Sequence, residues 1–319
     1  MCNVVFHNMK YYLSCANIIA MDIRSLKYFL SLADNLHFGK ASAESHISIS
    51  TLSRQIRQLE DELGVSLFIR DNRSVELTQE GQLFAQYARE AVAQWSSVRN
   101  QLAALGGDLQ GEVSLYCSVT AVYSLLYDLF REAREAFPGI EIKLHTGDPD
   151  HAIERVMAGE EDMSIAAHPL TLPRGLAFKP ITKSPLVFIK PLEAVEAWDL
   201  PLQVSKQNND FVETWSQAPM IVPEAGLSRK RLDTWFRNLG ITPRVYAQVS
   251  GNEAIVTMVS LGLGVGIVPK IVLDNSPVAD RVQIVPVQPQ LEPYHVGVFV
   301  QTKNLNNPLV QAFWSLLPE

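Results

Sequence analysis

The chain has 319 residues, of which 47% are hydrophobic and 19% are charged. This length and composition allow two or three domains with buried cores, and they exclude an intrinsically disordered chain. Because 34 acidic residues outnumber 27 lysines and arginines, the formal net charge is −7, so no overall positive field attracts nucleic acid. Any affinity for nucleic acid must therefore be local.

The cysteines and the first residues bear on the compartment. Cys2, Cys15 and Cys117 show no metal-ligand spacing and no even disulfide framework, which suits a reducing cytoplasm, and the histidines also lack metal-ligand spacing. No apolar run approaches the length of a membrane span. Residues 1–20 are mildly apolar, but Lys10 interrupts them and no small-residue cleavage site follows, which argues against a signal peptide. We interpret them as a start-site extension or a disordered tail without an assigned function.

Residues 22–64 have the pattern of helices joined by a tight turn. An apolar helix face is expected first, then a short helix over 39–46 and a longer helix that Ser48 caps and Gly64 ends. The apolar face of the first helix contains Leu26, Phe29, Leu30, Leu32 and Ala33. The apolar stripe of the longer helix contains Leu52, Ile56, Leu59 and Leu63. A helix-turn-helix is the arrangement that this spacing predicts.

The outer face of the longer helix is polar, with hydroxyl and guanidinium groups. Such groups reach base edges and phosphates when the first turn of a helix enters the major groove. The candidate DNA-binding residues on and beside this helix are Lys40, Ser48, Ser50, Thr51, Ser53, Arg54 and Arg57. On periodicity alone, the alternative is an amphipathic helix with a solvated polar face.

Residues 66–77 read as a two-stranded wing with its turn at 70–73. Arg70 and Arg73 are candidates for phosphate contacts there, and the alternative is an exposed polar turn.

A helix then runs from Thr78 to about Leu105 and ends at Gly106-Gly107. Its apolar positions alternate by four and three residues, which predicts a seam for a partner helix. These positions are Phe84, Ala88, Ala91, Trp95, Val98, Leu102 and Leu105.

From Gly111 onward, strands and helices alternate, which favours α/β lobes with mainly parallel sheets. The first half is expected to have strands at 113–119, 140–146 and 163–167 and helices at 121–137 and 150–158. A strand-rich crossover at 180–191 leads into a second half with strands at 219–222 and 244–248, helices at 228–239 and 252–261, and the run 264–269. The chain returns through 295–301 to a last helix at 308–317, while residues 192–209 stay unplaced.

The long motif HISISTLSRQIRQLEDELGVSLFIRDNRSVELTQEG resembles the winged helix-turn-helix of LysR-type transcriptional regulators. The resemblance extends over residues 21–319. It implies a winged helix-turn-helix DNA-binding domain at 21–77, a linker and dimerisation helix at 78–107 and a two-lobed effector domain, like periplasmic binding proteins, at 111–319. Lobe I would contain residues 111–182 and 290–319, and lobe II residues 183–289. The resemblance also implies a double-stranded DNA operator, RNA polymerase as a partner, a dimer of dimers and a cytoplasmic location without a membrane.

Ligands of α/β sheets bind beyond the carboxyl ends of strands, where helix N-termini present free N–H groups. The resemblance implies that Ser118 and Thr120 contact the effector, and Thr146, His168 and Gly226 are further candidates at strand ends. Such a pocket suits a small carboxylate with hydroxyl or keto groups, and no other cofactor is expected. Alternatively, Ser118 and Thr120 only cap the next helix. Cys117, inside an apolar strand, reads as a buried small residue rather than a redox sensor.

Further runs, among them HFGKAS, CSVTAVYS, IEIKLHTGD and GNEAIVTMVSLGLGVGIVP, are similar to a branch of this family that regulates branched-chain amino-acid biosynthesis. That branch activates a ketol-acid reductoisomerase gene, and its inducers are acetolactate and acetohydroxybutyrate. The resemblance therefore implies the same two inducers, or else a different small carboxylate. The sequence departs from this branch in the N-terminal extension and in residues 192–209.

Two other classes of protein compete with this interpretation. A solute-binding protein would explain the two-lobed half, but it needs export, which the absent signal peptide and the helix-turn-helix oppose. An enzyme would need a nucleophile elbow, a phosphate loop or paired carboxylates at a strand end, and the sequence shows none of these. Our hypothesis from the sequence is an effector-responsive transcriptional activator.

Overall fold

The computed structural model describes residues 22–71, 74–105, 109–193 and 209–318. Contacts between residues divide the chain into two compact units, Met1–Arg99 and Asn100–Glu319. The N-terminal tail, Arg73, the Gly106-Gly107 helix stop and most of the stretch 192–209 lie outside the described residues. Within the described ranges, no helix is long and apolar enough to cross a membrane.

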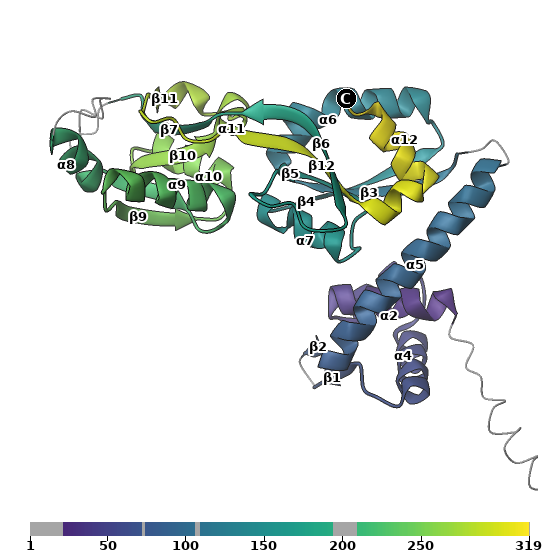
Figure 1. Ribbon diagram of the computed structural model, residues 1–319. Helices are drawn as coiled ribbons and strands as arrows, with labels where there is room; N and C mark the ends of the chain where they lie inside the picture. The colour runs from purple at the N-terminus through teal and green to yellow at the C-terminus, as the bar shows by residue number, and fades with distance from the viewer. Residues whose placement is uncertain (1–21, 72–73, 106–108, 194–208, 319) are drawn as a thin grey trace, which may run out of the picture. The chain divides into compact units, whose positions relative to one another are not determined.

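The first unit has short helices and a hairpin that lead into a long helix (Figure 1). Its elements are α2 (Ile23–Asn35), α3 (Phe38–Glu44), α4 (Ile49–Leu63), β1 (Phe68–Arg70), β2 (Val75–Leu77) and α5 (Gln79–Leu105). The Asp22 side chain caps α2 by accepting the Ser25 N–H at 2.7 Å. Gly64 ends α4 with a φ of 70°, a left-handed conformation that glycine adopts without a Cβ clash. Ser48 is the N-cap of α4 and Gly64 is its C-cap, as the sequence predicted.

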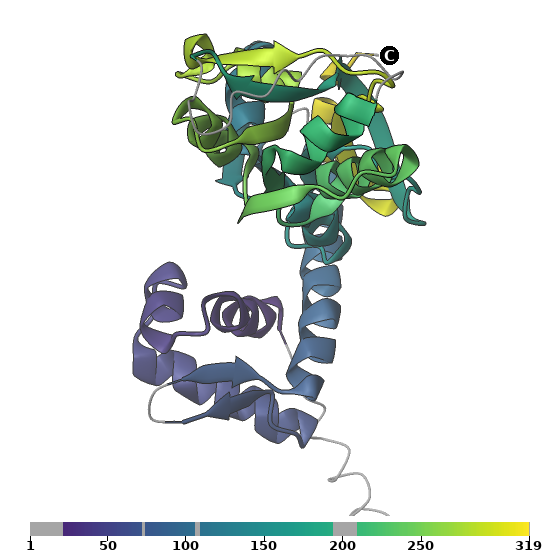
Figure 2. The same ribbon diagram turned by 90° about the vertical axis from the view of Figure 1, so that its left-hand side faces the viewer.

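The core of the first unit forms where α2 and α4 pack together. Phe29, Leu52 and Ile56 are completely buried, and the Phe29 ring lies 5.4 Å from the ring of Phe68 in β1. These positions follow the four-and-three spacing of the sequence. β1 and β2 pair antiparallel, and Figure 2 shows this hairpin beside the start of α5. Because Arg70 pairs with Val75 in the strands, the turn begins one residue later than the sequence predicted.

Helix α5 divides the predicted apolar seam into two parts. Phe84 and Ala88 pack into the core of the first unit, with the Phe84 ring 4.8 Å from Phe29, so they are not free for a partner helix. The seam prediction is therefore wrong for this half of α5, because the helix covers its own domain there. The large apolar side chains that α5 does expose are Leu83, Tyr87, Trp95, Val98, Leu102 and Leu105.

The second unit contains two five-stranded sheets, one in each lobe. Lobe I has β3 (Gly111–Cys117), α6 (Val119–Ala136), β4 (Ile140–Thr146), η1 (Pro149–His151), α7 (Ala152–Met157), β5 (Met163–Ala167), β6 (Leu176–Ser184), β12 (Tyr294–Gln301), η3 (Thr302–Asn306) and α12 (Pro308–Leu316). Lobe II has β7 (Leu186–Pro191), α8 (Asn209–Gln217), β8 (Pro219–Pro223), α9 (Gly226–Leu239), β9 (Arg244–Val249), α10 (Asn252–Ser260), β10 (Val265–Pro269), α11 (Lys270–Asp274), η2 (Ala279–Arg281) and β11 (Val282–Val285).

Both sheets are mixed, but in each of them four of the five strands run in the same direction, as the prediction of mainly parallel sheets required. The lobe I sheet has the order β4-β3-β5-β12-β6, and β12 runs antiparallel to both of its neighbours. The lobe II sheet has the order β11-β7-β10-β8-β9, and β7 is antiparallel to both β11 and β10. The reason is the chain path, because the two connections between the lobes enter the sheets as strands. Figure 1 shows β6 and β12 side by side where the chain passes between the lobes.

Alternating side chains of the strands pack against helices on opposite faces of each sheet. In β3, Leu115 and Cys117 face the cluster with α6 and α12, whereas Tyr116 faces α7. In lobe II, Phe188 of β7 contacts Trp215 and Trp235, from α8 and α9. Helices α8 and α11 and strand β11 were absent from the sequence prediction. All three are short, and each is stabilised by burial against the lobe II core, which local periodicity does not reveal.

Candidate functional site

The start of α4 carries a cluster of hydroxyl groups. The Ser48 Oγ accepts the Thr51 N–H at 3.1 Å and lies 2.9 Å from Ser50 Oγ and 2.8 Å from Thr51 Oγ1. The turn before the helix is tight, and His46 adopts a φ of 53°. The hydroxyl cluster is thus fixed at the positive end of the helix dipole, where phosphate oxygens bind well.

The outer face of α4 carries the predicted arginines. Arg54 and Arg57 are exposed, as is Lys40 on α3, whereas Ser53 is partly buried. Because Leu52, Ile56 and Leu59 hold the opposite face in the core, the arginines project from the surface of the unit. α4 therefore presents hydroxyls and guanidinium groups together on one surface.

Arg70 has a structural partner that the sequence did not indicate. Its guanidinium binds Glu60 Oε2 at 2.5 Å and lies over the Phe38 ring. The other Glu60 oxygen, Oε1, accepts the backbone N–H groups of Leu67 at 2.9 Å and Phe68 at 3.2 Å. Arg70 thus belongs to the joint between α4 and the wing, while the second predicted wing arginine, Arg73, lies outside the described residues.

A cavity of about 720 Å³ lies between the two lobes of the second unit. Residues from strand ends and helix N-termini of both lobes line it. Its polar lining includes Ser118, Thr120, Ser124, Asp148, Asp150, His151, Thr171, Glu224, Ser228, Lys230, Ser250 and Asn252. Small-molecule sites in proteins have cavities of this size.

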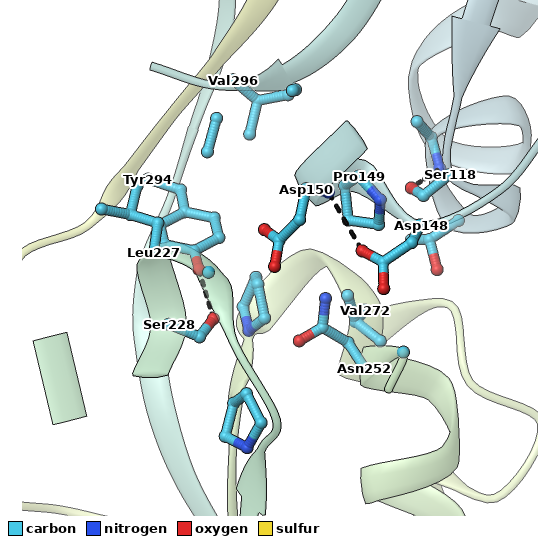
Figure 3. A pocket seen from close by; sticks show the side chains of 18 of the residues that line it. Ser118, Asp148, Pro149, Asp150, Leu227, Ser228, Asn252, Val272, Tyr294 and Val296 are labelled. Carbon is cyan, nitrogen blue, oxygen red and sulfur yellow. Dashed lines mark hydrogen bonds between the residues drawn. The ribbon is translucent and has the colours of Figure 1, made fainter. Parts of the chain in front are cut away.

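Hydrogen bonds connect the lobes around this cavity. The Thr120 hydroxyl of lobe I donates to Glu253 at the start of α10, and the Ser250 hydroxyl donates to Asp148 Oδ2 at 2.8 Å. Ser228 of α9 hydrogen-bonds the hydroxyl of Tyr294 in β12, as Figure 3 shows. Burial raises the pKa of Tyr294 to about 12, so its hydroxyl stays protonated at neutral pH. The lobes are thus joined by polar groups that also line or border the cavity.

Asp150 is the carboxylate with a shifted pKa in this cavity. Loss of water around its carboxyl and then the charge of Asp148 raise the pKa above the ordinary value, while His151 and Lys230 oppose the shift. The carboxylate lies against Gly226 of the opposite lobe. A Cβ at Gly226, whose φ is 80°, would lie 2.0 Å from Asp150 Oδ2. Glycine at this position therefore permits the close approach of the lobes.

The structure brings together three of the five predicted effector residues. Ser118, Thr120 and Gly226 line the cavity, and Ser118 also caps α6 by accepting the Ala121 N–H at 3.2 Å. Thr146 is exposed at the end of β4, outside the lining. His168 is also outside it, because its Nδ1 contacts the Pro169 carbonyl at 2.7 Å and its ring packs on Phe178.

The sequence prediction missed Asp148, Asp150 and Tyr294. The two aspartates follow β4 in the run TGDPD, so their position after a strand could have indicated them. Tyr294 enters the site from the second connection between the lobes, for which no local signal exists. Cys117 is completely buried, and burial raises its thiol pKa to about 12, which agrees with a structural rather than a reactive residue.

A winged helix-turn-helix unit joined to a two-lobed unit with a polar cavity defines a ligand-responsive DNA-binding regulator. Residues 23–82 match the bacterial regulatory helix-turn-helix protein, lysR family, and residues 106–319 match the LysR substrate binding domain. The chain belongs to the LysR family of transcriptional regulators and is not an enzyme.

Individual relatives agree with this assignment. The chain is 43% identical over 301 residues to the HTH-type transcriptional activator IlvY of Salmonella typhimurium. The alignment covers 93% of this chain and 100% of that protein. Its fold is similar to that of full-length OxyR from Pseudomonas aeruginosa, with a TM-score of 0.65, 22% identity and coverage of 94% of this chain and 97% of that one. It is also similar to full-length CbnR in complex with its target DNA, with a TM-score of 0.61, 21% identity and coverage of 93% and 99%.

Proposed function

We propose that this protein is a cytoplasmic transcriptional activator of a ketol-acid reductoisomerase gene and that acetolactate or acetohydroxybutyrate is its inducer. The observation that carries the proposal is the 43% identity to the Salmonella IlvY activator, which extends through both the DNA-binding unit and the effector unit. The alternative is a LysR-type regulator with a different small carboxylate as effector. Both versions place the effector in the cavity between the lobes.

The chemistry of the cavity supports a small, oxygen-rich anion. The first turns of α6, α9 and α10 all border it, so backbone N–H groups and the positive ends of three helix dipoles point toward the ligand. Lys230 adds a positive charge, and Ser118 and Thr120 add hydroxyl groups. Acetolactate and acetohydroxybutyrate carry one carboxylate, one hydroxyl and one keto group, and each of these groups has a suitable partner in this lining.

The DNA contact is proposed for the first turn and outer face of α4. Its hydroxyl cluster and the exposed Arg54 and Arg57 suit the major groove, and the exposed Lys40 suits a neighbouring phosphate. For the wing, only Arg73 is left as a phosphate candidate without a described structural role. Because the net charge of the chain is −7, this local group of bases must supply the electrostatic part of binding.

Self-association is proposed through α5. Its exposed apolar side chains follow one another along the helix, and Leu102 and Leu105 are 65% and 85% exposed. Exposed leucines at this spacing are typical of a helix that packs against a second helix. Pairing of two dimers would then give the tetramer expected for the family.

The mechanism follows from linkage between effector and conformation. An effector that binds both lobes shifts the equilibrium from the open toward the closed cavity. The size of this shift is set by the difference between its affinities for the closed and the open cavity. In a tetramer, that shift changes how the operator is bent, and the altered DNA is presented to RNA polymerase. A footprint and bend angle that are identical with and without inducer would contradict this step.

A thermal-shift series on the full-length protein tests the effector assignment. Acetolactate and acetohydroxybutyrate should raise the melting temperature saturably, because a ligand that binds the folded state stabilises it by mass action. Unrelated small carboxylates such as acetate and succinate are the controls. A rise with another carboxylate, and none with these two, would support the alternative regulator instead.

A further inference from the structure

Among the described residues, the carboxylates of Asp150 and Glu224 line the cavity without a hydrogen-bond donor, and of these two Asp150 lies against Gly226 of the opposite lobe. Both Asp148 oxygens are used, one by the Asp150 N–H at 3.0 Å and one by Ser250. Glu253 accepts the Thr120 hydroxyl. Figure 3 shows the Asp150 carboxylate pointing into the open space between Tyr294 and Asn252. Asp150 is therefore a carboxylate that still lacks a donor at the place where the two lobes meet.

A hydrogen bond holds the backbone of Asp150, and its carboxylate lies against the opposite lobe. The hydrogen bond between the Asp150 backbone and Asp148 holds the start of η1, and the Gly226 backbone lies directly against the Asp150 oxygens. The Tyr294 hydroxyl is already paired with Ser228. Hence the Asp150 carboxylate is available as an acceptor, and a ligand in the cavity can donate to it.

An ionised carboxylate accepts hydrogen bonds and repels a second carboxylate. The effector carboxylate is therefore expected to bind the donors of lobe II that line the cavity, Lys230 and the Asn252 amide, rather than Asp150 itself. With the effector in that orientation, a neighbouring hydroxyl can donate to Asp150. A keto group or a methyl group at the same place cannot donate, and it would leave Asp150 unpaired.

We propose that Asp150 is the residue that selects effectors with a hydroxyl group beside their carboxylate, by accepting a hydrogen bond from that hydroxyl. The inference rests on the proposed function, because it assigns one group of the acetolactate-type effector to one residue of the same cavity. The inference concerns specificity, so it is tested by the ratio of the affinities for two ligands, one with the hydroxyl group and one without it.

The test compares two ligands on the full-length protein by calorimetry. One is acetolactate, and the other is 2,2-dimethyl-3-oxobutanoate, in which a methyl group replaces the hydroxyl at similar size. The wild-type protein should bind acetolactate about 10-fold to 100-fold more tightly, the range expected for a hydrogen bond to a charged group. In Asp150→Leu this preference should fall to about 2-fold or less. Asp150→Asn, which keeps an amide oxygen as acceptor, should retain part of it.

Glu224→Gln is the matched control, because Glu224 is a second carboxylate in the lining of the same cavity. Removing its charge should change the affinity for both ligands by the same factor and leave their ratio unaltered. An Asp150→Leu protein that still prefers acetolactate as strongly as wild type would overturn the inference while leaving the proposed function intact. Failure of the wild-type protein to bind acetolactate would overturn both. Cooperative thermal unfolding of each variant without ligand shows that its effector unit is folded.

Discussion

The hydroxyl of Thr120 in lobe I donates a hydrogen bond to the Glu253 carboxylate at the first turn of α10 in lobe II. Thr120 is 7% exposed, so this bond forms at the inner edge of the cavity, where one lobe meets the other. A polar contact of this kind connects effector binding to the arrangement of the lobes, because a ligand near Thr120 also acts on the bond.

Replacing Thr120 by valine tests that connection. Valine has the same shape without the hydroxyl, so Glu253 loses its donor and the lobes lose one bridge. We expect the inducer-dependent thermal shift and transcriptional response to disappear while operator binding stays at the wild-type level. Thr120→Ser keeps the hydroxyl and should keep both properties. Loss of operator binding in Thr120→Val would indicate a folding defect instead.

Arg54→Ala tests the reading face of α4. If Arg54 contacts a base, operator affinity should fall by about 1–3 kcal/mol and discrimination against other sequences should weaken. If it contacts a phosphate, affinity should fall uniformly across sequences and the salt slope should decrease by about one. Gel-shift titrations at several salt concentrations distinguish the two. The control is Arg244→Ala, an exposed arginine on β9 of the other unit. Unchanged binding by Arg54→Ala would remove this residue from the interface.

Glu60 and Arg70 should act on stability rather than on DNA affinity. Glu60→Ala removes the acceptor for Leu67 N–H and Phe68 N–H and the partner of Arg70. We expect a loss of about 2–3 kcal/mol in the free energy of unfolding of this unit, measured by urea denaturation. The neighbouring exposed carboxylate offers a control, and Asp61→Ala should change stability by less than about 0.5 kcal/mol. A stable Arg70→Ala variant with a reduced salt slope would show that Arg70 contacts phosphate after all.

Cys117 should make stability depend on pH under alkaline conditions. Its pKa is raised from an ordinary value of 9.0 to about 12, so between these values the unfolded chain loses the thiol proton and the folded chain keeps it. The contribution of Cys117 is therefore fully present below pH 9 and is lost as the pH rises toward 12. Cys117→Ala, made with Cys2→Ser and Cys15→Ser, should flatten this part of the stability profile. Rapid labelling of Cys117 in the folded protein at pH 8 would contradict the assignment.

Much of the fold follows from local signals in the sequence. The Ser48 cap, the Leu52, Ile56 and Leu59 stripe and the Gly64 stop are all within one helix, so their spacing alone predicts α4. The same holds for β3, α6 and β4, where apolar runs of the expected lengths alternate. Ser118 and Thr120 follow a strand directly, and the family resemblance together with the rule for α/β sheets made them effector candidates; both line the cavity.

Other features depended on contacts between distant segments. Phe84 and Ala88 fit the predicted seam as well as Val98 and Leu102 do, and only packing against Phe29 shows that they belong to the domain core. The periodicity of a helix gives the face on which its apolar side chains lie, but it does not identify what covers that face.

The helix-turn-helix, the two α/β lobes and the strand ends that carry Ser118 and Thr120 were predictable from the sequence, because they depend on interactions between residues close together in the chain. The three-dimensional contacts were needed to show that Asp150 lies against Gly226, that Tyr294 enters the same cavity, and that His168 and Thr146 stay outside it. These relationships arise where the lobes meet. Side chains from opposite lobes come together through two chain crossings, and no local pattern records their distance or orientation.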